Sequence, residues 1–233
     1  MESNCLNCEG EWVEAMSWRA LFNREPHFLC QACQGKLEKI EGKRCIGCSR
    51  SMDDLPSNLV KGDTCLDCHR WNLDPEWKGI LHKNNSVYNY NDFLKEFLAR
   101  YKYRGDYALA RAFSHTIKTY LAKTEYDLII PIPLSDERLY ERGFNQSIAL
   151  LEEAEVRPSP ILTRLHTEKQ SKKTRKERLQ QKQVFQLEKS DLTGKSILLF
   201  DDIYTTGTTL RQAAKRLKDA GADKVSSLTL ARG

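Results

Sequence analysis

From residue 87 onward, short apolar runs alternate with longer stretches in which apolar residues recur every three or four positions. The short runs predict buried strands, and the longer stretches predict amphipathic helices. Strands are predicted at 87–90, 126–133, 196–200 and 224–230, and helices at 91–103, 107–121, 145–155 and 208–220. Apolar strands separated by helices are typical of a parallel sheet with helices packed on it, so the predicted fold class is α/β.

The first third of the chain has a different character, because all eight cysteines lie before residue 69. They form four Cys-x-x-Cys pairs: Cys5/Cys8, Cys30/Cys33, Cys45/Cys48 and Cys65/Cys68. Two residues between thiols let one tight turn direct both sulfurs at one ion, and two such pairs complete the tetrahedral set that zinc prefers. The spacing predicts two zinc ions with a structural role, since thiolates would occupy every coordination position.

A disulfide framework is the alternative use of these cysteines. The polar stretch at 1–11 contains no apolar core of a signal peptide, so we expect a cytoplasmic protein with reduced thiols. The pairing of the cysteines into sites remains open at this point. Sequential pairs would give two ribbons, an interleaved cross-brace uses the same residues, and the sequential arrangement is favoured.

The change in composition divides the chain. We expect a zinc-binding module over residues 1–80 and an α/β domain over residues 86–233, joined by the polar connector at 81–86. No apolar run approaches the roughly 18 residues that cross a bilayer, so membrane insertion is not expected. The formal net charge is +5, but eight thiolates and two zinc ions would lower it by four, so overall charge says little about partners.

The most informative segment lies at 197–209, ILLFDDIYTTGTT. A buried strand ends in Asp201 and Asp202, and the predicted helix follows the loop Thr205, Thr206, Gly207, Thr208 and Thr209. A threonine- and glycine-rich loop at a helix N-terminus presents backbone N–H groups and hydroxyls to a phosphate. The two carboxylates suit ribose hydroxyls or hydrated Mg²⁺. Together they predict a ribose-phosphate site, although a capped helix after a strand would produce part of the same pattern.

This segment resembles the phosphoribosyl-pyrophosphate signature of type I phosphoribosyltransferases. Further segments resemble the ComF family of late competence proteins in naturally transformable bacteria: KYRGD at 102–106, PIP at 131–133 and ERGFNQ at 141–146, together with the four cysteine pairs of a double zinc ribbon. The resemblance covers nearly the whole chain. It implies a phosphoribosyltransferase-like parallel sheet flanked by helices, preceded by a small double zinc-ribbon module. It also implies ribose contacts from Asp201 and Asp202, 5′-phosphate contacts from Thr205 to Thr209, and Mg²⁺ accompanying phosphoribosyl pyrophosphate.

Two basic regions complete the candidate site. By the same resemblance, Arg138 and Arg142 lie near the pyrophosphate loop after Pro133. The stretch 164–182 carries eight basic and two acidic residues, among them Lys172, Lys173 and Arg175. The resemblance places it where a flexible loop closes over pyrophosphate, and it would equally suit a nucleic-acid backbone. A solvated surface loop remains the alternative.

The resemblance favours a competence factor that handles incoming single-stranded DNA in the cytoplasm, at the inner face of the membrane through partners such as the helicase of the uptake machinery. An active phosphoribosyltransferase with an unidentified acceptor is the second hypothesis, and a zinc-ribbon adaptor with a vestigial pocket is the third. No catalytic residue is assigned, because no segment of the sequence reads as a nucleobase-binding hood.

Overall fold

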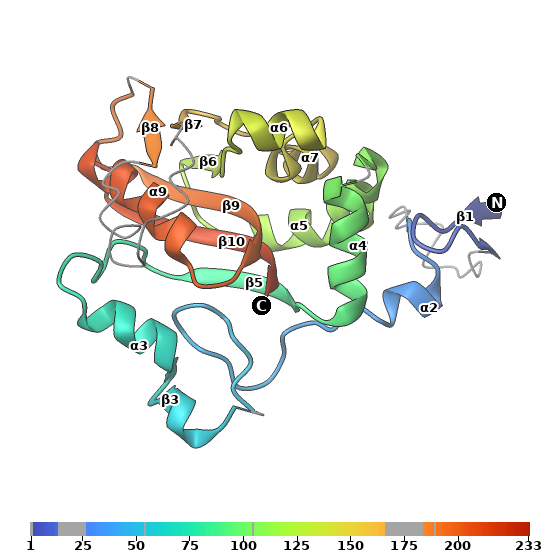
Figure 1. The fold of residues 1–233 in the computed structure, drawn as a ribbon, viewed down its shortest axis with the longest axis horizontal. Helices are drawn as coiled ribbons and strands as arrows, with labels where there is room; N and C mark the ends of the chain where they lie inside the picture. The colour runs from blue at the N-terminus through green and yellow to red at the C-terminus, as the bar shows by residue number, and fades with distance from the viewer. Residues whose placement is uncertain (1, 14–26, 54, 104, 166–183, 189) are drawn as a thin grey trace.

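A four-stranded parallel sheet lies at the centre of the molecule (Figure 1). The computed structural model describes residues 2–13, 27–53, 55–103, 105–165, 184–188 and 190–233. The strand order is β5-β10-β9-β6, with β5 at Asn84–Asn89, β6 at Leu128–Pro131, β9 at Ser196–Tyr204 and β10 at Lys224–Arg232. The predicted α/β class with a parallel sheet is therefore confirmed.

Helices cover both faces of this sheet. They are α4 (Asp92–Tyr103), the 3₁₀ helix η2 (Tyr107–Phe113), α5 (Ser114–Leu121), α6 (Asp136–Arg142), α7 (Gln146–Glu153) and α9 (Thr208–Asp219). Leu198 and Phe200 of β9 pack in one core with α4, η2, α5 and α7. Ile197 and Leu199, which point to the other face, pack in a second core with α9. The sheet is buried on both sides, which explains why its strands read as continuous apolar runs.

Several elements differ from their prediction. The helix expected at 107–121 is divided into η2 and α5, and β9 continues four residues beyond the predicted end at Phe200. Helix α6 and the antiparallel hairpin of β7 (Leu162–Arg164) and β8 (Phe185–Leu187) were not predicted. Helix α6 buries none of its side chains, so it carries no apolar periodicity for the sequence to reveal.

The polar connector expected at 81–86 is partly a strand, since β5 begins at Asn84. The Asn84 side chain is 1% exposed, and it donates to Ser86 Oγ at 2.8 Å and accepts from Ser227 Oγ at 2.8 Å. These hydrogen bonds satisfy the buried amide, so a polar segment occupies a buried position in an edge strand, where the sequence pattern leads one to expect apolar residues.

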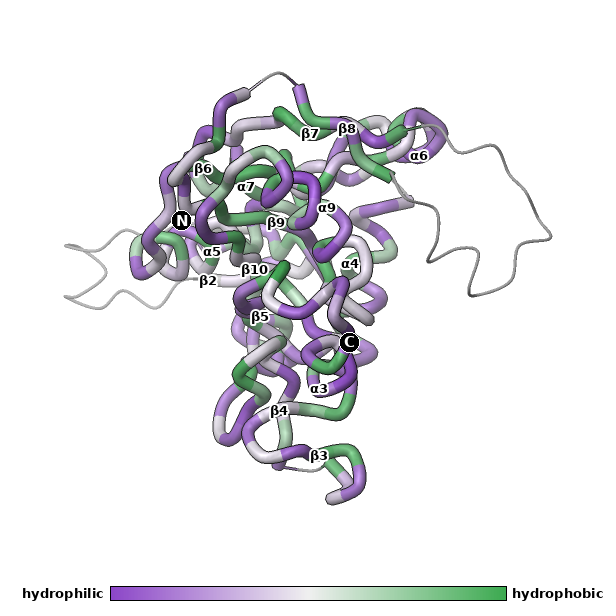
Figure 2. The backbone as a smooth tube through the Cα atoms, turned by 90° about the vertical axis from the view of Figure 1, so that its left-hand side faces the viewer, coloured by the Kyte–Doolittle hydropathy of each residue, from purple (hydrophilic) through white to green (hydrophobic). Residues whose placement is uncertain are grey.

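The cysteine-rich segments contain short elements held on different sides of the sheet. The first has the hairpin β1 (Glu2–Asn4) and β2 (Glu11–Val13) with α2 (Gln31–Gln34), and the second has η1 (Ser57–Leu59), β3 (Val60–Lys61), β4 (Thr64–Cys65) and α3 (Leu66–Leu73). Cys5 and Cys33 belong to the core of α4, whereas Cys45 and Cys68 belong to the core of α9. Figure 2 shows β3 and β4 at the opposite end of the molecule from β7 and β8.

Within the described ranges, none of the helices combines the length and the apolar character needed to cross a membrane.

Candidate ribose-phosphate site and cysteine clusters

Asp201 and Asp202 lie within β9, near its carboxyl end, rather than after the strand. Asp202 is 8% exposed, and its Oδ2 atom lies 2.5 Å from Lys102 Nζ. Asp201 accepts a hydrogen bond from Ser147 Oγ at 3.2 Å and from the backbone N–H of Asp202 at 2.9 Å. Burial and the neighbouring Asp202 carboxylate raise the pKa of Asp201 to about 7. The acid pair is therefore in contact with one lysine and one serine.

The segment ERGFNQ positions Ser147 beside the acid pair. Gly143 ends α6 in the left-handed conformation, at φ 77°, and Asn145 begins α7 by accepting hydrogen bonds from Ser147 N at 2.8 Å and Ile148 N at 3.2 Å. The Asn145 amide also donates to Ile132 O at 3.0 Å, at the end of the PIP strand. These contacts fix the first turn of α7, and so place Ser147 against Asp201.

The threonine-rich loop connects β9 to α9 at the carboxyl edge of the sheet, where ligands bind in open α/β folds. Thr206 Oγ1 and Thr208 Oγ1 lie 2.9 Å apart, and the Thr208 N–H faces Thr206 Oγ1 at 3.4 Å. Gly207 precedes the helix with φ 78°, and a Cβ atom there would collide with the side chains of Tyr204 and Arg211. Only glycine fits this turn, which leaves the N–H groups at the start of α9 available to an anion.

Basic side chains lie around the acid pair. Arg142, at the end of α6, donates to Gln146 Oε1 at 2.8 Å and stacks on Tyr103 with its guanidinium 5.6 Å from the ring centre. Burial, followed by the positive charge of Arg138, lowers the pKa of Arg164, and the negative charge of Asp201 acts in the opposite direction. The charges of Arg138 and Asp201 therefore both act on Arg164. Lys172, Lys173 and Arg175 lie outside the described residues.

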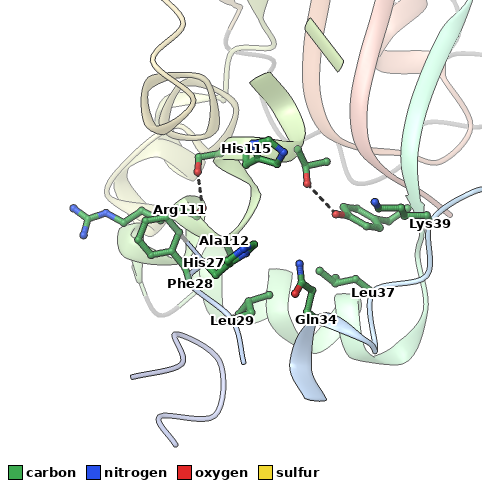
Figure 3. A pocket seen from close by; sticks show the side chains of 12 residues that line it. His27, Phe28, Leu29, Gln34, Leu37, Lys39, Arg111, Ala112 and His115 are labelled. Carbon is green, nitrogen blue, oxygen red and sulfur yellow. Dashed lines mark hydrogen bonds between the residues drawn. The ribbon is translucent and has the colours of Figure 1, made fainter. Parts of the chain in front are cut away.

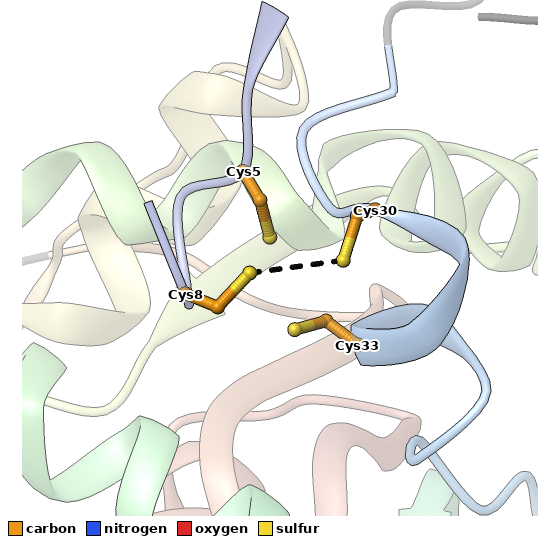
Figure 4. A group of neighbouring side chains, drawn as sticks. All are labelled: Cys5, Cys8, Cys30 and Cys33. Atoms are coloured by element: carbon orange, nitrogen blue, oxygen red, sulfur yellow. Dashed lines mark hydrogen bonds between the residues drawn. The ribbon is translucent and has the colours of Figure 1, made fainter. Parts of the chain in front are cut away.

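The eight cysteines form two groups of four, each with all its sulfur atoms within 4.8 Å of one another. Cys5, Cys8, Cys30 and Cys33 make the first tetrad (Figure 4), and Cys45, Cys48, Cys65 and Cys68 make the second. This confirms the sequential grouping. All eight thiols are free of disulfides.

The geometry of both tetrads fits zinc. Cys8 Sγ and Cys30 Sγ are 3.8 Å apart, and Cys48 Sγ and Cys65 Sγ are 3.6 Å apart. A tetrahedral site with Zn–S bonds of about 2.3 Å requires sulfurs about 3.8 Å apart. In the second tetrad a hydrogen bond from Cys48 lowers the pKa of Cys45 to about 6, whereas hydrogen bonds with its three neighbours raise the pKa of Cys68. A bound zinc ion would tie the two Cys-x-x-Cys turns of each tetrad together.

A cavity of about 300 Å³ lies away from the acid pair, between the first cysteine segment and the start of α5 (Figure 3). Phe28 and Leu37 come from the cysteine segment, and Arg111 and His115 come from η2 and α5. None of the sequence-predicted site residues lines it.

Several residues near the loop were missed by the sequence analysis. The sequence analysis included Lys102 in the KYRGD motif but assigned it no role, and it did not consider Ser147, which follows the ERGFNQ motif. Trp71 donates from Nε1 to Thr206 O at 3.0 Å, although 135 residues separate the two in sequence. No local pattern signals such a contact, because it depends on how the second cysteine segment folds back to the sheet.

A parallel sheet with an acid pair and a threonine-glycine loop at the carboxyl end of a central strand defines a protein with a phosphoribosyltransferase-like domain. The family profile described as the phosphoribosyl transferase domain matches residues 159–233. The chain is 42% identical to the competence protein ComFC of Bacillus subtilis (strain 168), over 98% of this chain and 94% of that protein. It is 32% identical to the competence protein ComFC of Streptococcus pneumoniae (strain ATCC BAA-255 / R6), over 98% of this chain and 99% of that protein. The chain therefore belongs to the ComF family of competence proteins.

Among solved structures, a hypoxanthine phosphoribosyltransferase from Staphylococcus aureus is 16% identical, with a TM-score of 0.34 over 53% of this chain and 62% of that one.

Proposed function

We propose that this protein is a competence factor that binds and handles incoming single-stranded DNA in the cytoplasm, using a phosphoribosyl-pyrophosphate-type pocket and two structural zinc sites. The identity of 42% over nearly the whole chain to a competence protein is the observation that carries this proposal. The pocket is formed by Asp201, Asp202 and the loop from Thr205 to Thr209.

The charges around the pocket support a polyanionic ligand. Arg138 and Arg142 lie on α6 and Arg164 on β7, and Lys172, Lys173 and Arg175 belong to the basic stretch that begins at Arg164. Basic side chains that neutralise backbone phosphates make binding depend strongly on salt. Tyr103 is 69% exposed next to Arg142, and such an aromatic ring can stack on an unpaired base.

In this function the ribose-phosphate pocket holds a sugar-phosphate unit, Mg²⁺ accompanies phosphoribosyl pyrophosphate, and the basic loop contacts the neighbouring backbone. The zinc module over residues 1–80 contacts the helicase of the uptake machinery, which places the protein at the inner face of the membrane. The α/β domain over residues 86–233 carries the pocket.

The test is fluorescence anisotropy of labelled single-stranded DNA at low and high salt, with and without Mg²⁺ and phosphoribosyl pyrophosphate. We expect salt-sensitive binding that phosphoribosyl pyrophosphate competes with. Lys172→Ala, Lys173→Ala and Arg175→Ala combined should abolish it, whereas the matched triple change Lys36→Ala, Lys39→Ala and Lys43→Ala in the cysteine segment should retain it. No binding at low salt by the unchanged protein would contradict a direct role on DNA.

An active phosphoribosyltransferase is the second candidate, favoured by the raised pKa of Asp201 beside the lysine-paired Asp202. Pyrophosphate release from phosphoribosyl pyrophosphate, measured with each DNA base and with water alone as acceptor, tests it. Release that is lost in Asp201→Asn with Asp202→Asn would support a transferase.

A further inference from the structure

The second cysteine tetrad is linked to the phosphate loop through helix α3. Helix α3 begins immediately after Cys65 and includes Cys68, so a metal ion in this tetrad would hold its first turn. One turn further along α3, the Trp71 indole donates its hydrogen bond to the Thr206 carbonyl at 3.0 Å. The helix that follows one candidate metal ligand, Cys65, and contains another, Cys68, therefore also supports the loop expected to hold a phosphate.

The side chain of Arg211 is buried beneath the loop. It is 5% exposed, its guanidinium lies 4.6 Å from the Trp71 ring centre, and its Nη1 donates to Tyr204 Oη at 2.6 Å. Among the described residues, no carboxylate makes an ion pair with it. The atoms of Arg211 and Tyr204 also occupy the space that a side chain at Gly207 would need. A buried guanidinium under this turn favours an anion on the turn's open side.

Arg232 makes a second connection from the same tetrad. Its Nε atom donates to Cys48 Sγ at 3.4 Å, and its Nη1 atom donates to Tyr204 O at 3.3 Å. The guanidinium also stacks on the Tyr204 ring at 4.9 Å, and Arg232 is 4% exposed. A donor to a cysteine sulfur stabilises the thiolate that binds a metal, and here that donor also holds the last residue of β9.

We propose that Trp71, Arg211 and Arg232 are positioning residues through which a metal ion in the second tetrad holds the phosphate loop in its anion-binding geometry. This inference rests on the proposed ribose-phosphate site. Because such coupling is reciprocal, a ligand on the loop also retains the metal in this tetrad. The first tetrad, which packs in the other core, is outside this coupling.

Trp71→Phe tests the coupling, because it keeps an aromatic ring beside Arg211 and removes the N–H donor, at the cost of part of the ring. The matched control is Trp12→Phe in the first cysteine segment, where the buried Nε1 atom has no hydrogen-bond partner among the described residues. The probe is ribose 5-phosphate, measured by calorimetry on the full chain carrying two zinc ions. We expect Trp71→Phe to bind about three- to tenfold more weakly with unchanged zinc content, in proportion to one lost hydrogen bond, and Trp12→Phe to bind normally.

The rate of zinc transfer to a chromogenic chelator is a second measurement of the coupling. Saturating ribose 5-phosphate should slow release of one of the two zinc ions from the unchanged protein, and Trp71→Phe should remove most of this protection. Amide hydrogen exchange at residues 205–210, measured without any ligand, should rise when zinc is removed and also in Trp71→Phe.

The outcomes separate the coupling from the proposed function. Unchanged ribose 5-phosphate affinity and unchanged zinc protection in Trp71→Phe would overturn the coupling, as would loss of zinc from that variant. If the unchanged protein does not bind ribose 5-phosphate but zinc removal still raises exchange at residues 205–210, the ribose-phosphate function fails while the support of the loop by the tetrad stands.

Discussion

Lys102 Nζ lies 2.5 Å from Asp202 Oδ2, and their side chains are 15% and 12% exposed. The pair joins the last turn of α4 to the carboxyl end of β9, two elements 100 residues apart in sequence. Burial and the neighbouring Asp202 raise the pKa of Asp201 to about 7, whereas Asp202 is the member that pairs with the lysine. The two adjacent aspartates are thus chemically different before any ligand arrives.

Lys102→Met should lower the free energy of unfolding by about 3 kcal/mol, because it leaves the Asp202 carboxylate buried without its partner. Lys102→Met combined with Asp202→Asn should be less destabilised than the sum of the single changes. Urea unfolding measures both. Lys118→Met is the control, since Lys118 pairs with Glu155 at an exposed position and should cost less than about 1 kcal/mol. Additive single changes would show that Lys102 and Asp202 do not interact.

Asp201→Asn should stabilise the protein more at pH 8 than at pH 6. The pKa of Asp201 is about 7 in the folded chain and about 3.9 in an unfolded one, so between these values the folded state binds the extra proton. The free energy of unfolding therefore falls as the pH rises through this window, by about 1 kcal/mol from pH 6 to pH 8. Asparagine keeps the acceptor for Ser147 and does not titrate. Denaturant unfolding at the two pH values measures the difference, and an equal effect at both would contradict a raised pKa.

Gly207→Ala should abolish ribose 5-phosphate binding and destabilise the fold by about 2 kcal/mol or more. The added methyl group meets the side chains of Tyr204 and Arg211, in a left-handed backbone that alanine already disfavours. Gly194→Ala is a matched control, because Gly194 has φ +71° with open space around it. That variant should cost about 1 kcal/mol and leave binding unchanged. Calorimetric binding and thermal unfolding separate the two effects, and similar results for both variants would show that backbone strain alone matters.

Zinc should leave the protein in two kinetic phases. In the first tetrad Cys8 is exposed and Cys30 is half-buried, whereas all four cysteines of the second tetrad are buried. Cys8→Ala should therefore remove the fast phase and about one zinc ion per chain, as measured with a chromogenic chelator and by metal analysis. Cys48→Ala should remove the slow phase. If Cys8→Ala removed the slow phase and Cys48→Ala the fast one, burial would not control the rate of zinc release.

Periodicity predicted most of the α/β domain, because the strands are buried on both faces and the helices carry clear apolar stripes. On α4, the apolar residues Leu94, Phe97, Leu98 and Tyr101 are buried, and Phe93 packs partly buried against the same core. The pattern predicted β5 but missed its first three residues, because Asn84 and Ser86 form hydrogen bonds in a buried network that an apolar pattern does not reveal. It also placed the end of β9 too early, because aspartates are read as breaking a strand even when a lysine neutralises one of them.

The candidate site was predictable where one segment carries it, and less so where it depends on tertiary contacts. The loop from Thr205 to Thr209 is one contiguous segment, and the spacing of the Cys-x-x-Cys pairs identifies them in the sequence. Lys102, Trp71 and Arg232 reach the site from elements separated in the chain, and their residue types are common in ordinary surfaces and cores.

The position of β10 between β5 and β9 has a consequence for the order of folding. Within the sheet, β5 pairs with β10, whereas β6 and β9 pair with each other without it. A strand near residue 84 must therefore wait for residues 224–232 before it gains its neighbour. Such a long-range pairing closes slowly, so we expect β6 and β9 to associate early and the cysteine segment attached to β5 to dock late. A chain still emerging from the ribosome would therefore have its cysteine pairs available before the sheet that supports them is complete.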